Sequence, residues 1–488
     1  MDSGGRANAA GWAIGTTLLT AVGLAAVVSG RIPLGVPGEW EWLRVTIPAE
    51  PIALGLGLVA VAVYSCVAAV GLRTLARTDR PHRAVEGAWL GLLFVAAVLV
   101  QGMIQEAAPT GHGLAKWALA LINPGSSGYY TVARERMHDT PRFLADYSEW
   151  IRSQGSLHIG THPPGLFLWA RGSLDVMEAR PDLARGVIAW APESVDRAFR
   201  AVVGEGGLAA ADRASLIVTG AATLIVCAGT VVPLYLLARR RMNAAGAWAV
   251  ASAWPLVPAA LMFQPASDTA FPLLAVGAWL AISWSERAWG WAIVAGVIMA
   301  IGMQFSLVFL AVGAIAAVVI ATAGEASLAR RATRFFATGA GFLAMTVAAG
   351  VMMRANPFAI WWANQANHAQ FYVDFPRSRL AWTLETPIEV AVAIGLAYAA
   401  RAAAGLRLAP RETWAAAAVL LLLLITGRSL SEVARLWIPF FPLLLLAVGR
   451  EFADGRSRSA SLAWMLALAG IQTIVLQTAI QVVYPVPV

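Results

Sequence analysis

The segment with the clearest potential for chemistry is Gly155-Ser156-Leu157-His158-Ile159-Gly160-Thr161-His162-Pro163-Pro164-Gly165. It holds two imidazoles and a hydroxyl, those of His158, Thr161 and His162, just before a pair of prolines. Imidazoles donate and accept hydrogen bonds and exchange protons near neutral pH, so the segment suits binding and acid–base work. A bundle of apolar helices needs no such loop to fold. We therefore expect a reaction chamber at a membrane surface.

The composition shows what must position these residues. Of the 488 residues, 59% are hydrophobic and 13% are charged, whereas a soluble domain carries about 25% charged residues. The mean hydropathy is +0.66. The formal charge of +8 fits arginines that hold loops on one side of a membrane, so no nucleic-acid partner is expected.

Runs of around twenty apolar residues recur along the chain, and each is long enough to cross about 30 Å of hydrocarbon as a helix. We expect an all-α polytopic membrane protein with about 13 transmembrane helices and a long external loop, 106–212, carrying interfacial helices. The expected spans lie near 11–29, 52–72, 86–105, 213–238, 245–263, 269–285, 288–303, 306–323, 335–352, 387–404, 413–427, 436–449 and 460–482.

The arginines predict how the chain is oriented. When the spans alternate, the arginine-rich segments all fall on one side, namely 73–85, 239–241, 330–334, 401–411 and 450–458. The positive-inside rule makes this side cytoplasmic, together with the N-terminus, and places the 106–212 loop outside. High arginine, alanine and glycine with a single lysine, Lys116, is typical of a GC-rich bacterial genome, hence of a plasma membrane. No nucleotide-binding motif is present.

Within the long loop, 129–138 and 142–153 have helical spacing. Phe143, Tyr147 and Trp150 recur at steps of three and four, with Asp146 between them. This pattern is typical of a helix in the interfacial plane with its charges toward water, and a docked surface helix without catalytic duty is the alternative.

The His-Pro-Pro segment, 158–165, predicts a rigid elbow. Residues that precede proline avoid the α region, so 161–165 should be extended, and an apolar helix should start at Leu166. The elbow then presents His158, Thr161 and His162. Alternatively, the prolines only break the chain and the histidines are incidental. The spacing of the two histidines outside a helix does not favour a zinc pair.

Charged residues also stand at the outer ends of predicted spans. Asp268 lies where two spans meet, and a carboxylate at that depth is costly unless it faces a wet cavity or lies in a solvated loop. Glu432 and Arg435, three residues apart, share one face of a helix entering the membrane, with Arg428 a turn or two earlier. A guanidinium there is suited to hold the phosphate of a lipid, or else simply neutralises Glu432.

These residues together resemble the polytopic membrane glycosyltransferases of the GT-C class, which includes protein mannosyltransferases and aminoarabinose transferases. The resemblance covers roughly 86–450. It depends on the order Tyr129-Tyr130-Thr131-Val132-Ala133-Arg134-Glu135, then His162-Pro163-Pro164-Gly165, Asp268, and Glu432-Val433-Ala434-Arg435-Leu436-Trp437 with Pro439 and Pro442.

The resemblance implies a membrane glycosyltransferase that moves a sugar from a polyprenyl-phosphate donor to an acceptor at the outer face. It also implies an Asp or Glu in the first long external loop that acts as base or binds a divalent metal; no metal ligands are assigned. The acidic residue usual before the Tyr-Tyr motif is replaced here by Ser126, Ser127 and Gly128. The carboxylate must then be another residue, and the candidates are Asp146, Glu106, Asp139 and Glu149.

The roles follow from the chemistry of such a transfer. Asp146 or Glu106 would take the acceptor proton, and His162 would hydrogen-bond hydroxyls. Positive charge must hold the departing phosphate, which Arg435 would supply. The remaining residues expected to bind substrate are Tyr130, Arg134, His158, Thr161, Asp268, Arg428 and Glu432.

On this resemblance the chain divides into an N-terminal two-helix extension, 1–85, a membrane module, 86–352, and a third part, 353–488, with an external loop and the last transmembrane helices. Two other functions stay open. A secondary transporter or flippase for a lipid-linked saccharide would have unwound elements near mid-membrane, which Gln304 and several prolines favour. A non-catalytic membrane subunit would bind a partner through loop 106–212.

Overall fold

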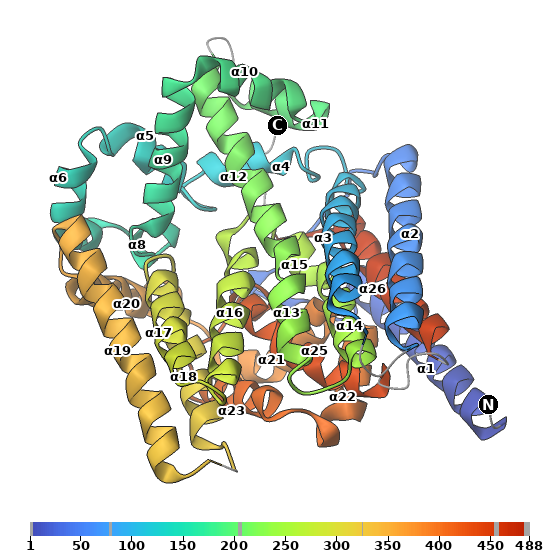
Figure 1. The fold of residues 1–488 in the computed structure, drawn as a ribbon. Coiled ribbons are helices and arrows are strands. Elements are labelled where there is room, and N and C mark those ends of the chain that lie inside the picture. The colour runs from blue at the N-terminus through green and yellow to red at the C-terminus, as the bar shows by residue number, and fades with distance from the viewer. Residues whose placement is uncertain (1–2, 78–80, 204–206, 325, 453–457, 483–488) are drawn as a thin grey trace.

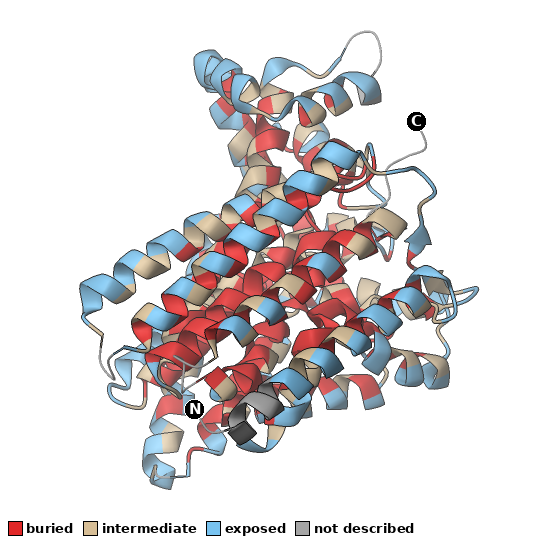
Figure 2. Ribbon diagram, turned by 90° about the vertical axis from the view of Figure 1, so that its right-hand side faces the viewer, coloured by how far each residue is buried: buried red, intermediate tan, exposed pale blue. Residues whose placement is uncertain are grey.

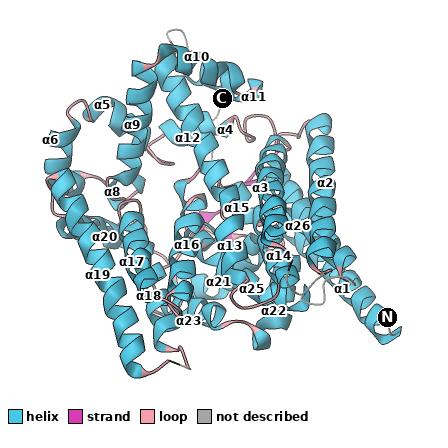
Figure 3. Ribbon diagram, in the orientation of Figure 1, coloured by secondary structure: helices cyan, strands magenta, loops and turns pink. Residues whose placement is uncertain are grey.

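The computed structural model describes residues 3–77, 81–203, 207–324, 326–452 and 458–482, without the side chains of 3–9 and 202–203. Nearly all of the described chain is helical, with four two-residue strands (Figures 1 and 3). The long helices run roughly side by side, and a smaller group of helices from the 106–212 segment extends from one end of them (Figure 1).

Six helices among the described residues are long and apolar enough to cross a membrane. A seventh span is obtained if α21 (Arg379–Ile394) and α22 (Leu396–Gly405) count as one, bent by 106°. The protein is therefore a mostly helical, multi-pass membrane protein. The six spans are α1 (Ser3–Val28, apolar from Ala10), α2 (Pro51–Leu75), α3 (Arg83–Glu106), α12 (Ala210–Gly229) continued by α13 (Val231–Ala238), α19 (Leu328–Met353) and α26 (Ser459–Ala479).

The structure has fewer full-length spans than the thirteen that apolar runs predict. Six of the predicted spans fold as helices of 15 residues or fewer, and 14 residues cover only about 21 Å. Prolines interrupt them, as at the 3₁₀ turn Trp254–Leu256 and at Pro258. These shorter helices are α14 (Ala244–Ala253), α15 (Pro258–Met262), α16 (Phe271–Trp284), α17 (Gly290–Met303), α18 (Phe309–Ala321), α23 (Arg411–Ile425) and α25 (Phe441–Gly449).

The shorter helices form the centre of the bundle. Every residue of α14 is buried, whereas the long outer helices expose apolar faces (Figure 2). Buried tryptophans also satisfy their polar atoms: the indole of Trp248 donates to the Ala68 carbonyl at 2.8 Å and that of Trp254 to the Cys227 carbonyl at 2.7 Å. The prolines and tryptophans thus shape a core rather than additional simple spans.

The 106–212 segment is a compact group of short helices. The predicted helix at 129–138 is confirmed as α5, and the one at 142–153 is broken at Asp146 into two short helices followed by a 3₁₀ turn. The apolar helix expected after the prolines is α9. The helices are α4 (Lys116–Ile122), α5 (Tyr129–Arg136), α6 (Thr140–Ala145), α7 (Tyr147–Trp150), α8 (His158–Thr161), α9 (Gly165–Ala179), α10 (Pro181–Trp190) and α11 (Glu193–Val203).

Two small sheets link the N-terminal part to the rest. β1 (Gly35–Val36) and β2 (Trp40–Glu41) form a hairpin, and β3 (Leu43–Arg44) pairs with β4 (Ile480–Gln481) near the C-terminus. The hairpin docks against α21 through contacts described below. The segment predicted as an N-terminal extension therefore packs into the body of the protein.

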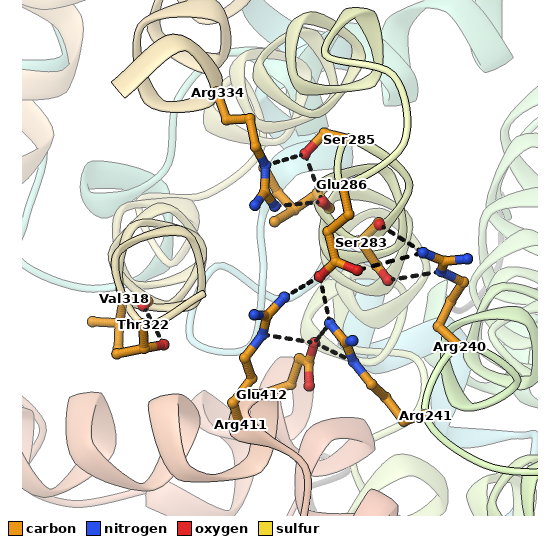
Figure 4. A network of polar contacts seen from close by, with 11 residues as sticks. Arg240, Arg241, Ser283, Ser285, Glu286, Val318, Thr322, Arg334, Arg411 and Glu412 are labelled. Carbon is orange, nitrogen blue, oxygen red and sulfur yellow. Dashed lines mark hydrogen bonds and ion pairs between the residues drawn. The ribbon is translucent and has the colours of Figure 1, made fainter. Parts of the chain in front are cut away.

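A network of arginines and glutamates joins the helix ends opposite to the 106–212 segment (Figure 4). Arg241 bridges Glu286 at 2.8 Å and Glu412 at 2.5 Å. Arg411 also pairs with Glu286, and Arg334 donates to Ser285 at 2.8 Å. Three arginine-rich segments predicted to share one side thus meet in space. Arg80 and residues 453–457 of the other two lie outside the described residues.

Candidate functional site

A cavity of about 480 Å³ lies where the 106–212 segment meets the helical bundle. Polar residues widely separated in sequence line part of it, and three of them, Asp268, Glu432 and Arg435, lie together at what is here called the polar end. The polar lining residues are Ser126, Ser127, Tyr129, Tyr130, His158, Ser267, Asp268, Glu432 and Arg435.

Arg435 is the centre of charge at the polar end. Its Nη2 lies 2.6 Å from Glu432 Oε2, and its Nε lies 3.9 Å from Asp268 Oδ2. At that distance Nε makes no hydrogen bond, and it is buried without a partner among the described residues. A buried donor left in this way costs free energy that an acceptor in the cavity would recover. Arg435 therefore has hydrogen-bonding capacity that Glu432 and Asp268 do not use.

The turn that carries Glu432 and Arg435 has a strained backbone. Ser431 and Glu432 have φ angles of 65° and 49°, a region that costs a residue with a side chain about 1 kcal/mol. The turn precedes the one-turn helix α24 (Val433–Leu436). Its backbone is held from outside, since Glu389 accepts the Ala434 N–H at 3.0 Å and the Tyr372 hydroxyl accepts the Leu430 N–H at 3.2 Å. The surroundings thus fix both charged side chains.

The His-Pro-Pro elbow forms another wall. His158 begins the one-turn helix α8, so the prediction of extended backbone is wrong for Thr161, whereas His162 is extended as expected. The prediction is also wrong for Pro164 and Gly165, because Pro164 has helical angles and Gly165 begins α9. His158 lines the cavity. His162 lies behind it, with its Nδ1 2.9 Å from the His158 carbonyl and its ring 5.4 Å from that of Tyr129. Thr161 bonds within α8 and does not line the cavity.

Asparagines of α20 (Pro357–Asp374) hold the elbow in place. Asn364 donates to the carbonyls of Gly160 and His162, each at 3.0 Å. Asn367 donates to the carbonyls of Ile151 at 2.7 Å and Gly160 at 3.0 Å. These amides bind backbone, so the elbow has one geometry, and they serve as its support.

The enclosed position of these groups changes their protonation. Burial lowers the pKa of His158, and the nearby charge of Arg435 lowers it further. Burial also lowers the pKa of His162, although Asp268 works in the opposite direction. For Arg435 burial acts to lower the pKa, but Glu432 and Asp268 outweigh it and raise the pKa. At neutral pH the wall thus has two neutral imidazoles beside a fixed cation.

The rest of the cavity wall is largely apolar. Helices α9, α12, α16 and α17 line it, and nothing charged is among the residues that they contribute. A pocket of this kind suits an amphiphile whose charged group sits at Arg435 and whose chain lies between helices. The lining residues from these helices are Leu166, Trp169, Ala170, Leu216, Thr219, Ala222, Thr223, Val226, Phe271, Leu273, Leu274 and Ile301.

Two of the predicted catalytic residues lie elsewhere. Asp146 is exposed at the junction of α6 and α7 and does not line the cavity. Glu106, at the end of α3, accepts the Ser194 hydroxyl at 2.7 Å and is also absent from the lining. The aromatic side of the α6–α7 segment explains the placement of Asp146: Phe143, Tyr147 and Trp150 pack together, so the alternate face with Asp146 turns to solvent.

Tyr130 and Arg134 belong to a charge network behind the cavity. Tyr130 is on the cavity wall, but its hydroxyl donates to Asp212 at 2.5 Å. Arg134 pairs with Glu178 and lies 3.4 Å from Asp212. Arg134 lines a second, polar cavity of about 630 Å³ instead. Arg428 is exposed and lines neither cavity.

Trp40 and Val482, which come from near the two ends of the chain, are among the cavity residues that sequence reasoning missed. The only signal for Trp40 was an aromatic shortly after two turn glycines, Gly35 and Gly38, and that pattern also fits a membrane-interface anchor. Tyr129 was part of the recognised motif, and the structure puts its ring against both His162 and Phe167.

The fold and the cavity together define a multi-pass helical membrane protein with an amphiphilic cavity at one end of its bundle. No family model matches the chain, and neither does any curated protein. Across the described ranges, no three His, Cys, Asp or Glu side chains lie close enough to hold a metal ion. The cavity itself is therefore the feature that bears on function.

Proposed function

We propose that the protein is a glycosyltransferase that transfers a sugar from a polyprenyl phosphate to an acceptor in this cavity. The proposal depends on one observation, the presence of two features in the same cavity. One is Arg435, whose Nε has no hydrogen-bond partner, and the other is an apolar wall formed by helices. A lipid-linked phosphate has the same two parts. The resemblance to the GT-C class supports the same donor.

The transfer needs a proton acceptor and a stabilised leaving group. The acceptor hydroxyl gives its proton to Asp268, and its oxygen forms a bond to C1 of the sugar. The bond between C1 and the phosphate oxygen breaks, and its electron pair leaves on the polyprenyl phosphate, which Arg435 holds. Asp268 replaces Asp146 in this role because it lines the cavity and Asp146 does not.

Arg435 also links binding to catalysis in this scheme. Its charge lies near both Asp268 and Glu432. An incoming phosphate binds the guanidinium and draws it away from the Asp268 carboxylate. Donor binding therefore also uncovers Asp268.

The membrane placement belongs to the same proposal. The arginine network of Arg240, Arg241, Arg334 and Arg411 lies at the cytoplasmic face, as the positive-inside rule favours, and the cavity opens toward the outer face of a plasma membrane.

A secondary transporter or flippase is the second candidate, and the bend of 106° between α21 and α22 favours it. Discontinuous helices of this kind line the sites of many transporters. The test is an assay of proteoliposomes with radiolabelled polyprenyl-phosphate sugar and the wild-type protein. Transfer of label to a new product supports the enzyme, and movement of intact donor across the bilayer supports the transporter. If neither is observed, the partner-binding subunit is the function that remains.

The same assay tests the base. Asp268→Asn should lower transfer at least about 100-fold, because the amide cannot take the proton. Asp182→Asn is the matched control, since Asp182 is exposed on α10 and pairs with Arg185. Normal transfer by Asp268→Asn would disprove its role, and loss in Asp146→Asn instead would restore the role that the sequence predicted for Asp146.

A further inference from the structure

The hairpin of β1 and β2 brings an aromatic ring into the cavity. Trp40 lines the cavity, although the helices nearest in sequence, α1 and α2, contribute nothing to the lining. The backbone of the hairpin is specialised for this position. Gly35 has a φ of 100°, and a Cβ there would lie 2.2 Å from the Trp40 carbonyl oxygen. Only glycine therefore allows Trp40 to sit where it does.

The hairpin is fixed to α21 by several contacts. Glu39 accepts the Ser378 N–H at 2.9 Å and the Trp382 indole N–H at 2.7 Å. Glu385 accepts the Gly35 N–H at 3.3 Å. The rings of Trp40 and Trp382 lie 6.4 Å apart. The Trp40 side chain is thus held on a rigid element, as a binding surface requires.

The same helix also positions Arg435. Glu389 of α21 accepts the N–H of Ala434, next to Arg435, and lies one helical turn from Glu385. One face of α21 therefore supports both the hairpin and the arginine turn. Trp40 thus reaches the cavity from the side of α21, the helix that also supports the turn of Arg435.

We infer that Trp40 is the platform on which the sugar ring of the donor lies. The inference rests on the proposed function and names the residue that distinguishes a sugar-bearing lipid phosphate from a bare one. A sugar ring presents C–H groups on one face, and these pack favourably against the negative face of an indole. With the phosphate at Arg435, the attached sugar is beside the ring that α21 places there.

The test compares equilibrium binding of two probes to purified full-length protein: a polyprenyl phosphate and the same lipid carrying a hexose. In Trp40→Leu, which keeps an apolar side chain but has no ring, affinity for the hexose-bearing lipid should fall roughly tenfold. Affinity for the bare lipid should stay within about twofold. Trp40→Phe should recover most of the loss. Trp289→Ala, an exposed tryptophan near the arginine network, is the control.

Three results would overturn the inference. Equal losses for both lipids would mean that Trp40 contacts the chain or supports the fold. No loss for either lipid would mean that it contacts nothing. If the wild-type protein bound neither lipid, the proposed function would fail and this inference with it. Selective loss for the hexose-bearing lipid, with an unchanged unfolding temperature, supports it.

Discussion

At Arg435 one guanidinium faces two carboxylates and still has an unused donor. Two carboxylates beside one half-buried guanidinium are costly to assemble, because each ion loses water and the turn holding Glu432 has an unfavourable φ. A purely structural ion pair would need only one carboxylate and no cavity. The arrangement is better explained by a ligand that accepts the hydrogen bond left unused by Arg435.

The first prediction concerns this guanidinium. Arg435→Ala should lower sugar transfer by about 100-fold or more, because the departing phosphate loses its charged partner. Arg435→Lys should recover part of the activity, since it restores charge but not the planar fork. Rates measured with saturating acceptor check both. Arg197→Ala, whose side chain is 72% exposed on α11, is the control, and equal activity of Arg435→Ala and this control would contradict the assignment.

The second prediction concerns pH. Burial lowers the pKa of His158, His162 and His368 below the ordinary value near 6.5. The unfolded chain therefore binds more protons, so the stabilisation is present above about pH 6.5 and is lost as pH falls toward the folded values. The unfolding temperature in detergent should drop between pH 7 and pH 5. His158→Gln should reduce this slope, while His138→Gln, on the second cavity, should not. A slope unaffected by His158→Gln would contradict the argument.

The sequence predicted five polar residues of the cavity wall. Tyr130 was predicted from the resemblance, and His158, Asp268, Glu432 and Arg435 because charge or imidazole beside apolar runs needs a wet environment. It could not predict which carboxylate faces the cavity. An amphipathic pattern such as that around Asp146 gives two faces but not which face turns inward. It also missed Trp40, because residues more than 390 positions apart can line one cavity without any local signal in the sequence.

At the scale of elements, the elbow depends on close approach of backbones. The Gly165 N–H donates to the Gln304 carbonyl at 2.7 Å, and a Cβ at Gly165 would lie 2.4 Å from that oxygen. The start of α9 is thereby joined to the end of α17. The prolines predicted the start of α9 correctly, but the partner at Gln304 could be known only from the fold.

The third prediction follows from this contact. Gly165→Ala should destabilise the protein by roughly 1–3 kcal/mol, because α9 and α17 must separate, and it should also impair transfer by moving the elbow. Gly172→Ala is the matched control in the same helix, since a Cβ there meets nothing within 4 Å. Unfolding temperatures of the two variants provide the measurement. Equal stability would show that the two helices can shift freely.

The predicted number of spans failed at this scale for a physical reason. Hydropathy detects apolar runs, but a run inside a large bundle can be a short buried helix as well as a span. Here α14 is buried along its whole length. The bend at Gly395, where φ is 109°, likewise turns one predicted span into two helices, α21 and α22.

At the scale of the whole molecule, charge and cavity lie at opposite ends of the same helices. α16 begins beside the cavity at Phe271 and ends near Glu286 in the arginine network. α17 runs back from the network side to Ile301 on the cavity wall. This polarity gives the bundle a definite direction in the membrane and underlies the proposed orientation.

The fourth prediction tests that direction. In a Cys66→Ala background, Arg185→Cys on α10 should react with a membrane-impermeant maleimide in intact cells. Arg330→Cys, exposed at the start of α19, should react only after permeabilisation, because it lies with the arginines. Both positions are exposed in the structure, so a difference in maleimide labelling reports the side of the membrane and not burial. The reverse labelling pattern would mean that the orientation is inverted and that the cavity faces the cytoplasm.

The binding of a polyprenyl phosphate in the cavity is tested most directly by a cryo-electron microscopy structure of the protein with this lipid. We expect phosphate density within hydrogen-bond distance of the Arg435 guanidinium and the isoprenoid chain between α9, α12 and α16. Lipid density confined to the outer surface of the bundle, with Arg435 still bound only to Glu432, would contradict it.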